Sequence, residues 1–505
     1  MDMPRRVSLF FTFVLTVVLL TGSSYAIPAF SRQYGTSCTT CHIDFPKLND
    51  FGKAFKDAGF KFPKGDEDFI KVPVVMLGAP AQKELWPHTV FPGTIPGLPP
   101  IGLRFNQFFQ YTSGNANNYN IAQQNTGPYI PTTDFQPGYF SIFTAGNFGS
   151  DISFWVDDDI SVAGANANGA LGDAYLRFVN VSRFFKLPTD SLTLKVGQFE
   201  LDLPFTQARA YDISAYDIYS QANIGANLVS PGVDNHVTLA GPGRGIELSG
   251  GHHYGGYRYA IAVVDQNTSN TAPANPNVPT ATSFPFVSDS NFKDLYGRVA
   301  YRFNLERDPA SRHDVQAAGA TGPRDHTYLT LGSYYFYGRS VQRIAGETTV
   351  LTGREPFYRV GGDFDFNYRK FNLYGLFMYG HDNSLLVNST TDPTGFLPGT
   401  SAKFNGGFLQ ADYLALPWLM AIMRYDRVQS TTDFLNPTVG NYFMPVGSTR
   451  DRITPGVQFL IHANIKASFE YAIRPSQALS YDPTTLQAVN PFRTNTATGA
   501  LEFVY

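Results

Sequence analysis

Apolar and polar side chains alternate in segment after segment of this chain, from about residue 100 to its end. In one such segment, Val360 and Phe364 lie on one face, and Arg359 and Asp363 lie on the other. Gly, Pro, Asn and Asp residues separate the segments. An alternation with period two places successive side chains on opposite faces of a strand. The pattern therefore predicts many strands with one apolar and one polar face.

These strands have the character of a membrane barrel. The apolar runs beyond the N-terminus, such as 260–264 and 418–423, are far shorter than the about 20 residues that a spanning helix needs. Within lipid, only helices and closed barrels satisfy the backbone polar groups. Aromatic residues on one face and charges on the other are typical of a barrel with a polar lumen. We predict an all-β fold, a transmembrane outer-membrane β-barrel with a small N-terminal α-helical segment.

The predicted barrel has about sixteen strands, an even number as in bacterial single-chain barrels. Their approximate ranges are 102–112, 137–147, 149–160, 170–181, 190–199, 243–251, 256–264, 292–304, 326–338, 356–368, 370–381, 404–414, 417–428, 450–461, 464–474 and 497–505.

Short and long connections alternate between these strands, as periplasmic turns and extracellular loops do. The order places both ends of the barrel on the periplasmic side, and only the link 305–325 is longer than this order predicts. The last residues, 501–505, resemble the C-terminal assembly signal of outer-membrane barrels. A soluble array of β-sandwiches is the alternative, and regular strand pairs without domain linkers disfavour it.

Composition excludes several other classes. Charged residues make up 16% of the 505 residues, against about 25% in an average soluble protein, and aromatic residues make up 15%. So many aromatic residues disfavour disorder, and two cysteines cannot build a disulfide scaffold. A formal charge of -3 disfavours sequence-independent binding of nucleic acid, so we expect no nucleic-acid partner.

The first 26 residues have the pattern of a signal peptide. Arg5 and Arg6 precede the apolar run 7–20, and small residues at Ser24 and Ala26 follow it. We expect cleavage after Ala26, with an uncleaved anchor as the alternative. The domain organisation is then 1–26 signal peptide, 27–99 a segment that contains both cysteines and a linker, and 100–505 barrel.

Both cysteines lie in Cys38-Thr39-Thr40-Cys41-His42, the C-x-x-C-H sequence that attaches a c-type haem. Two thiols at this spacing can bond to the two vinyl groups of one haem, and the adjacent His42 can then bind the iron. A zinc site, a redox-active cysteine pair and a structural disulfide are the alternatives. A zinc site needs further ligands, and a redox pair needs a βαβ context that is not visible here. We predict one covalently attached haem c, with Cys38, Cys41 and His42 as its binding residues.

The sixth ligand of the iron has two candidates in the N-terminal segment. Met76 lies in a short apolar run, and His88 follows Trp86-Pro87 in a proline-rich stretch. A thioether ligand raises the reduction potential relative to two imidazoles, which suits a donor such as ferrous iron. We predict Met76 as the ligand, with His88 or an open position as the alternatives.

One helix is predicted between the haem motif and Met76. Leu48, Phe51 and Phe55 follow a helical period, Asn49 can begin the helix, and Gly59 can end it. Its apolar face would cover the haem edge, although the same pattern also fits packing on any small core.

The sequence resembles one known family at its N-terminus. The stretches Ile27-Pro28-Ala29-Phe30-Ser31-Arg32-Gln33-Tyr34-Gly35-Thr36-Ser37-Cys38 and Phe45-Pro46-Lys47-Leu48-Asn49-Asp50-Phe51-Gly52-Lys53-Ala54-Phe55-Lys56 resemble those of the fused monohaem cytochrome-porins. That family includes outer-membrane ferrous iron oxidases. The resemblance implies a haem domain fused to a sixteen-stranded barrel, with Cys38, Cys41 and His42 in their family roles. It fixes neither the sixth ligand nor the substrate, because such proteins need not all oxidise iron.

The resemblance also implies electron uptake from extracellular Fe(II) and delivery to periplasmic carriers, a cytochrome c or a copper protein. We expect the chain to lie among outer-membrane lipids, with its haem segment on the periplasmic side or inside the lumen. Such a chain would be an Fe(II)-oxidising electron-transfer protein. The rivals are a diffusion porin with a haem-bearing plug and an outward conduit to extracellular metal oxides.

Three further features carry weaker expectations. Asp157-Asp158-Asp159 is either a cation-attracting cluster at a barrel mouth or, as we expect, a solvated strand end. His252-His253 lies in a glycine-rich turn, where a metal site is the less favoured interpretation. The stretch 241–245 is not a phosphate-binding loop, because no helix pattern follows it.

Overall fold

The structure is a computed structural model of the whole chain. The residues it describes are 29–44, 47–62, 70, 74–76, 84–85, 94–96, 101–112, 133–136, 139–148, 151–161, 170–206, 213–214, 216–221, 239, 241–251, 255–265, 292–305, 327–341, 354–388, 396–430, 449–473, 480–481, 488–489 and 495–504. The signal-peptide prediction for 1–26 lies outside this set.

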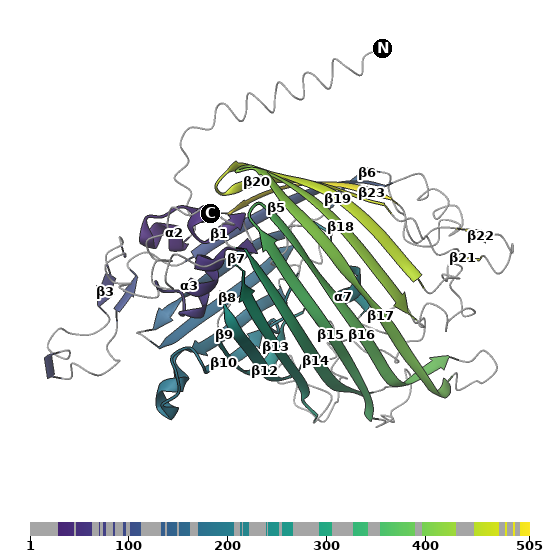
Figure 1. The fold of residues 1–505 in the computed structure, drawn as a ribbon, viewed down its shortest axis with the longest axis horizontal. Helices are drawn as coiled ribbons and strands as arrows, with labels where there is room; N and C mark the ends of the chain where they lie inside the picture. Colours follow the sequence, from purple (N-terminus) through teal and green to yellow (C-terminus); the bar gives the residue numbers. More distant parts are fainter. Residues whose placement is uncertain are drawn as a thin grey trace, which may run out of the picture.

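A closed antiparallel β-barrel makes up most of the described residues (Figure 1). Its segments are β5 (Ile101–Thr112), β6 (Thr133–Gln136), β7 (Tyr139–Phe148), β8 (Ile152–Ser161), β9 (Ala170–Phe178), β10 (Thr193–Phe199), β11 (Gly243–Gly251), β12 (Gly256–Asp265), β13 (Asp294–Asn304), β14 (Tyr328–Val341), β15 (Arg354–Tyr368), β16 (Phe371–Asn388), β17 (Phe396–Leu416), β18 (Leu419–Ser430), β19 (Thr449–His462), β20 (Ile465–Ala472) and β23 (Thr496–Val504).

These seventeen segments make sixteen strands. β6 and β7 count as one strand, because both pair with β5, β7 along residues 101–105 and β6 along residues 108–111. The barrel closes where β23 pairs with β5, with Phe503 opposite Phe105. Arg104 and Lys466 both form ion pairs with Glu502 at this seam. The predicted fold class is confirmed.

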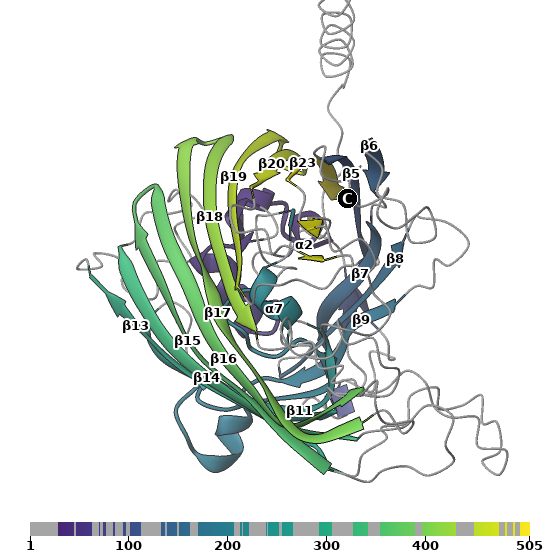
Figure 2. The same ribbon diagram turned by 90° about the vertical axis from the view of Figure 1, so that its right-hand side faces the viewer.

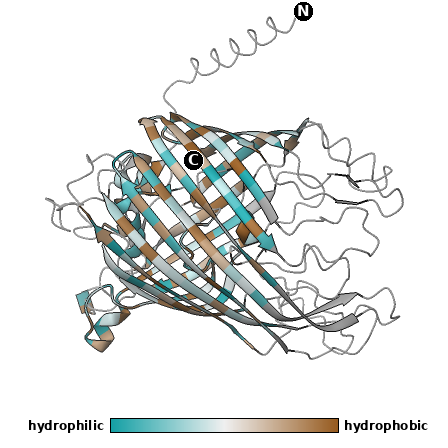
Figure 3. Ribbon diagram, turned by 45° about the vertical axis from the view of Figure 1, so that its right-hand side comes forward, coloured by the Kyte–Doolittle hydropathy of each residue, from teal (hydrophilic) through white to brown (hydrophobic). Residues whose placement is uncertain are grey.

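The outer face of the barrel is apolar and the inner face is rich in charge, as predicted. Val360 and Phe377 are 38% and 56% exposed, whereas Arg359 and Asp363 are 0% and 8% exposed. Hydrophobic and hydrophilic positions alternate along the strands that face the viewer in Figure 3. An apolar outside with inward charges is the arrangement of barrels that face lipid.

The strand boundaries differ from the predicted ones where the backbone turns. The predicted strand 170–181 ends at Phe178, because Asn180 has φ 62°, in the left-handed region. The predicted strand 190–199 begins at Thr193, because Asp190 has φ 63°. Residues at such angles leave the extended conformation that a strand needs.

Both ends of the barrel lie at the same rim, as the alternating link lengths predicted. Ile101 at the start of β5 pairs with Thr144 near the end of β7, and Val504 of β23 pairs with Arg104. The two-residue turns 369–370, 417–418 and 463–464 also lie at this rim, which we call the short-turn rim.

The lumen contains a packed apolar core, which the prediction of a polar lumen did not include. Its members include inward-facing aromatic residues of the wall and residues from the connection between β10 and β11. That connection carries α7 (Asp217–Gln221), which lies inside the ring of strands in Figure 2. The core includes Phe199, Leu201, Tyr216, Ile218, Tyr219, Leu239, Tyr296, Tyr334, Phe336, Phe357, Tyr374, Phe404 and Phe408.

The N-terminal elements also lie within the ring (Figure 2). They are α2 (Ala29–Tyr34), the 3-10 turn η1 (Cys38–Thr40), β1 (His42–Asp44), β2 (Lys47–Leu48) and α3 (Asp50–Asp57). We call the described residues 29–44 and 47–62 the plug. The predicted helix is confirmed as α3, since the side chain of Asn49 accepts a hydrogen bond from the Gly52 N–H at 2.8 Å and caps it.

Two further pairs of short strands are described. They are β3 (Val74–Met76) with β4 (Thr94–Pro96), and β21 (Ser480–Tyr481) with β22 (Ala488–Val489). Among the helices of the described residues, none has the length and apolar character to span a bilayer.

Candidate functional site

The cysteine motif lies in a tight turn of the plug. The Cys41 N–H donates to the Cys38 carbonyl at 3.2 Å, and the Thr40 N–H donates to the Ser37 carbonyl at 3.1 Å. The 3-10 turn η1 spans Cys38–Thr40, so Cys38 lies at its start and Cys41 directly follows its end. Strand β1 then begins at His42. Neither thiol is in a disulfide. The turn therefore presents two free thiols and an adjacent imidazole.

Helix α3 packs directly on the motif. The Asn49 N–H donates to the Cys41 carbonyl at 2.9 Å, and the Asn49 side-chain amide donates to the Thr40 carbonyl at 3.0 Å. A Cβ at Gly52 would overlap the carbonyl oxygen of Cys41. Glycine at position 52 is therefore required for this close approach of helix and motif.

Burial sets the ionisation of both thiols. It raises the pKa of Cys41 to about 12, and the neighbouring Cys38 thiol adds to the shift. Burial also raises the pKa of Cys38, although a hydrogen bond with Ser31 opposes the change. Both thiols are therefore neutral at neutral pH.

An aromatic cluster forms the core of the plug. Phe55 lies 5.1 Å from Phe30 and 5.7 Å from Tyr34 between ring centroids, in edge-to-face geometry. Phe60 extends the cluster to the barrel wall, where its ring lies 5.8 Å from that of Trp155 on β8. The cluster thus packs α2 and α3, the two helices that flank the motif in sequence, against each other.

These residues fit a c-type haem. Two unpaired thiols in one tight turn match its two thioether bonds, and the imidazole of His42 matches an axial ligand. The aromatic cluster, on the two helices that flank the motif, would supply apolar surface to a porphyrin held there. Among the described residues, including the motif itself, no group of three or more His, Cys, Asp or Glu side chains is arranged to hold a metal ion directly.

The predicted sixth ligand is not tested by this geometry. Met76 ends β3, which pairs with β4 through Met76 and Thr94. In Figure 1 β3 is drawn apart from α2 and α3. His88 lies outside the described residues. The assignment of Met76 therefore stays a prediction.

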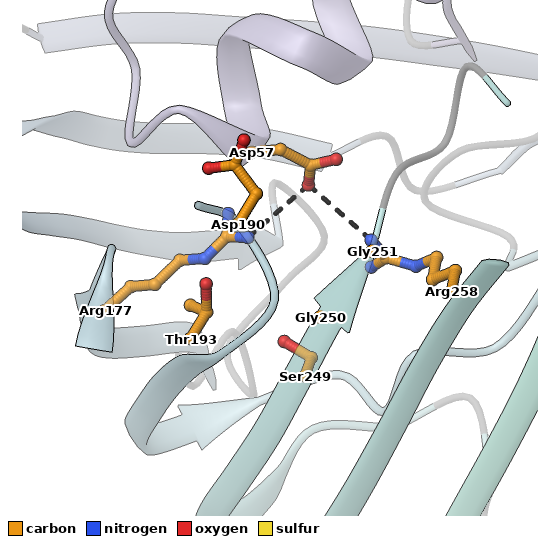
Figure 4. Close-up of a pocket in the computed structure, with 8 residues that line it drawn as sticks. All are labelled: Asp57, Arg177, Asp190, Thr193, Ser249, Gly250, Gly251 and Arg258. Carbon is orange, nitrogen blue, oxygen red and sulfur yellow. Dashed lines mark hydrogen bonds and ion pairs between the residues drawn. The ribbon is translucent and has the colours of Figure 1, made fainter. Parts of the chain in front are cut away.

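Ion pairs attach the plug to the inner wall at the short-turn rim. Asp57 of α3 lies between Arg177 of β9 and Arg258 of β12, at 3.4 and 3.7 Å (Figure 4). Arg177 also donates to the Lys56 carbonyl at 2.8 Å. Arg258 is shared with Asp202, at 2.9 Å. One helix end is therefore fixed to two strands at once.

The other end of α3 and the strand before it make similar contacts. Asp50 accepts two hydrogen bonds from Arg302 of β13. Lys47 donates to Asn372 at 2.9 Å, and its ammonium lies 3.5 Å from Asp412 and 4.2 Å from the centre of the Tyr374 ring. The plug is thus bound to strands around much of the ring.

Sequence reasoning missed these pairings. The alternation predicts inward-facing arginine residues, as at Arg359, and the helical period predicts a helix that begins at Asn49, directly before Asp50. The available signal was inward-facing arginine on several strands together with carboxylates on one short helix. The pairing itself joins residues far apart in sequence, which periodicity cannot show.

A second segment crosses the lumen. We call residues 213–214 and 216–221 the strap. The carboxylate of Glu470 on β20 accepts hydrogen bonds from the backbone N–H groups of Ile213 and Ser214. Arg424 on β18 donates to the Ser214 carbonyl at 3.0 Å and to its hydroxyl at 2.6 Å.

The strap is also held by charge and aromatic packing. Arg452 forms an ion pair with Asp217 at 3.2 Å and another with Asp426 at 3.0 Å. The Tyr216 ring stacks on Phe408 with centroids 4.0 Å apart. The strap therefore narrows the lumen at the level of these residues.

The weaker sequence features have different outcomes. Asp157 accepts hydrogen bonds from the Trp155 indole at 2.8 Å and from the Asp173 N–H at 2.7 Å, so it lies within β8 as part of a local network. His252 and His253 lie outside the described residues. Strand β11 begins at Gly243, so a strand rather than a helix follows the stretch 241–245.

No model of a known protein family matches the sequence, and no curated protein matches it. Solved porin-like barrels are similar at low identity. OmpF of Salmonella typhi in complex with daunomycin is 11% identical with a TM-score of 0.41, over 80% of this chain and 97% of that chain. OprB of Pseudomonas putida at high pH is 10% identical with a TM-score of 0.44, over 80% and 94%. OmpT of Vibrio cholerae, an outer-membrane protein in trimer form, is 7% identical with a TM-score of 0.40, over 80% and 98%. Likeness at this level carries no argument, and the barrel fold rests on the strand pairing described above.

Proposed function

We propose that this chain is an outer-membrane cytochrome-porin that carries electrons from extracellular Fe(II), through one c-type haem, to a periplasmic carrier. The observation that carries the proposal is the C-x-x-C-H turn, with free Cys38 and Cys41, in a plug bound inside a closed barrel. The lipid membrane otherwise prevents electron transfer between its two sides. A redox group in its lumen would bridge that barrier.

Each part of the plug has a task in this proposal. Cys38 and Cys41 would form the thioether bonds, His42 would bind the iron, and Met76 is the proposed sixth ligand. The haem supplies reversible one-electron chemistry when bound. The chain would attach the haem, orient it through α3, and place it beside the aromatic cluster. Each Fe(II) would become Fe(III), and the carrier would take up that one electron.

The position of the plug supports delivery to the periplasm. It is bound near the short-turn rim by Asp57, Asp50 and Lys47. In bacterial barrels, short turns face the periplasm and long loops face the outside. A soluble cytochrome c or copper protein would therefore meet the protein at this rim. Extracellular Fe(II) would approach from the long-loop side.

A diffusion porin with a haem-bearing plug is the second candidate, and the closed sixteen-stranded barrel favours it. Barrels of this size enclose an aqueous channel when nothing fills them. Here the plug and the strap both occupy the lumen, which favours restricted flux. An outward conduit would use the same parts with the reverse direction of electron flow.

Anaerobic titration of the purified protein with Fe(II) tests the proposal. We expect a c-type absorption spectrum that changes from the oxidised to the reduced form as Fe(II) is added. A variant with Cys38→Ser and Cys41→Ser is the matched control and should carry no covalent haem. A haem that stays oxidised in excess Fe(II) would overturn the oxidase assignment, and rapid solute flux through reconstituted protein would favour the porin.

A further inference from the structure

The connection between β9 and β10 presents two aromatic rings to the outside. It contains the 3-10 turn η2 (Val181–Phe185). Phe184 is 85% exposed and Phe185 is 65% exposed. This turn projects outward beyond the strands, at the lower left of both Figure 1 and Figure 2. We call residues 181–187 the foot.

Two residues with positive φ and two backbone hydrogen bonds define the conformation of the foot. Asn180 and Lys186, on either side of η2, have φ 62° and φ 53°. Residues other than glycine rarely adopt the left-handed region. Two hydrogen bonds close the turn, from the Lys186 N–H to the Arg183 carbonyl at 3.2 Å and from the Leu187 N–H to the Ser182 carbonyl at 3.0 Å. The exposure of the two rings is therefore a property of a defined turn.

The base of the foot is attached to the barrel wall. The Gly251 N–H at the end of β11 donates to the Asp190 carbonyl at 3.0 Å. The Tyr259 hydroxyl of β12 donates to the Ser191 carbonyl at 2.8 Å. Ser182 is 1% exposed, and its N–H donates to the Leu192 carbonyl at 3.3 Å. The fold thus holds the aromatic pair at a fixed place on the short-turn rim.

The surface next to the foot is the lipid-facing wall. Leu176 of β9 and Val196 of β10 are 43% and 38% exposed on the outer face, and Leu187 of the foot is 49% exposed. The apolar surface of the foot therefore continues the apolar outside of the two strands that it joins. Exposed aromatic residues at the end of a membrane barrel belong to the interfacial belt.

Basic residues flank the aromatic pair. Arg183 and Lys186 are both exposed, and the Arg183 side chain is 72% exposed. Arg183 lies 3.7 Å from Asp151, a carboxylate that is itself 44% exposed, and such a surface pair is weak. Cations beside aromatic rings at an interface match anionic phospholipid headgroups above an acyl layer.

We propose that the foot is a lipid-binding anchor. Phe184 and Phe185 insert into the leaflet that borders the short-turn rim, and Arg183 and Lys186 bind its anionic phosphate groups. The anchor fixes the depth and tilt of the barrel at the rim where the plug is attached. It is independent of the proposed haem.

The test uses the full chain, reconstituted in vesicles, with Phe184→Trp as an optical probe. The difference in emission from the unsubstituted chain isolates this position from the native tryptophans. The vesicles contain phosphatidylcholine with or without phosphatidylglycerol, and lipids brominated near the headgroup or near the chain end. Leu176→Trp is the control on the lipid-facing strand.

We expect emission at position 184 to shift to shorter wavelength in vesicles and to be quenched most by bromine near the headgroup. A second variant adds Arg183→Gln and Lys186→Gln, and we expect it to lose the extra quenching that phosphatidylglycerol gives. Solvent-like emission without quenching at position 184, with Leu176→Trp still quenched, would overturn the proposal. So would protection of position 184 that disappears on dilution of protein in lipid, because that result means a second copy covers the foot.

Discussion

Arg302 of β13 donates hydrogen bonds to both carboxylate oxygens of Asp50, at 2.8 and 2.7 Å. The guanidinium also lies 3.6 Å from the centre of the Tyr328 ring. Asp50 is the first residue of α3, so this pair joins the helix that packs on the cysteine motif to the barrel wall. Charge-assisted bonds of this two-fold kind fix orientation as well as distance.

Arg302→Gln should loosen the plug without unfolding the barrel. The substitution removes both hydrogen bonds to the carboxylate of Asp50, whose side chain is 20% exposed, and loss of such bonds to a charged group costs about 2 kcal/mol. We expect faster hydrogen exchange in α3 and unchanged exchange in β15 and β16, measured by mass spectrometry. Lys293→Gln, which removes an exposed ion pair with Asp265, is the matched control. Unchanged exchange in α3 would show that the pair does not hold the plug.

Gly52→Ala should reduce haem attachment. Its Cβ overlaps the backbone of Cys41, so α3 must move away from the motif. Forcing one extra methyl into such a contact costs about 2 kcal/mol, or roughly thirtyfold in the packing equilibrium. The ratio of covalent haem to polypeptide, from the pyridine haemochrome spectrum, measures the effect. Gly297→Ala is the control, since a Cβ there has nothing within 4 Å, and equal haem content in both variants would contradict the account.

Arg424→Ala should raise the ion conductance of the barrel. Arg424 is fully buried and holds the strap through two hydrogen bonds to Ser214. Without them the strap keeps the hydrogen bond from the Asp217 N–H to Asp426 on β18, at 3.3 Å, but it is held less firmly to that strand, and we expect the lumen to widen. Single-protein conductance in a planar bilayer measures the change. Arg427→Ala is the control, because that side chain is 56% exposed on the same strand. Equal conductance in the two variants would mean that the strap does not restrict flux.

Met76→Ala should lower the reduction potential of the haem if the thioether binds the iron. A thioether ligand stabilises the reduced iron and so raises the reduction potential. Its replacement by a weaker ligand or by a nitrogen ligand should therefore lower that potential. Potentiometric titration of the full chain gives the value, with His88→Ala as the parallel variant. An unchanged potential in Met76→Ala, with a change in His88→Ala, would assign the position to His88.

Much of the barrel could be predicted from the sequence, because period-two alternation determines which face each residue occupies. Arg359 and Asp363 are buried and Val360 is exposed, as the pattern required. Strand ends were less accurate, since a single left-handed residue such as Asn180 can end a strand inside an alternating run.

Contacts within the lumen could not be predicted in this way. The sequence identified α3 and its cap at Asn49, because those signals are local. The partners of α3 come from strands far along the chain, as Arg302 does for Asp50. The strap was missed because the connection between β10 and β11 carries no strong helical period. Only the closed barrel brings it against Glu470 and Arg424.

Transfer of electrons across a sealed bilayer tests the central claim most directly. The full holoprotein is placed in vesicles that contain a soluble oxidised cytochrome c, and Fe(II) is added outside under anaerobic conditions. We expect reduction of the enclosed cytochrome, and no reduction with the Cys38→Ser and Cys41→Ser variant. Retention of a small enclosed dye checks that the vesicles do not leak. An enclosed cytochrome that stays oxidised while the protein carries its haem would contradict the account.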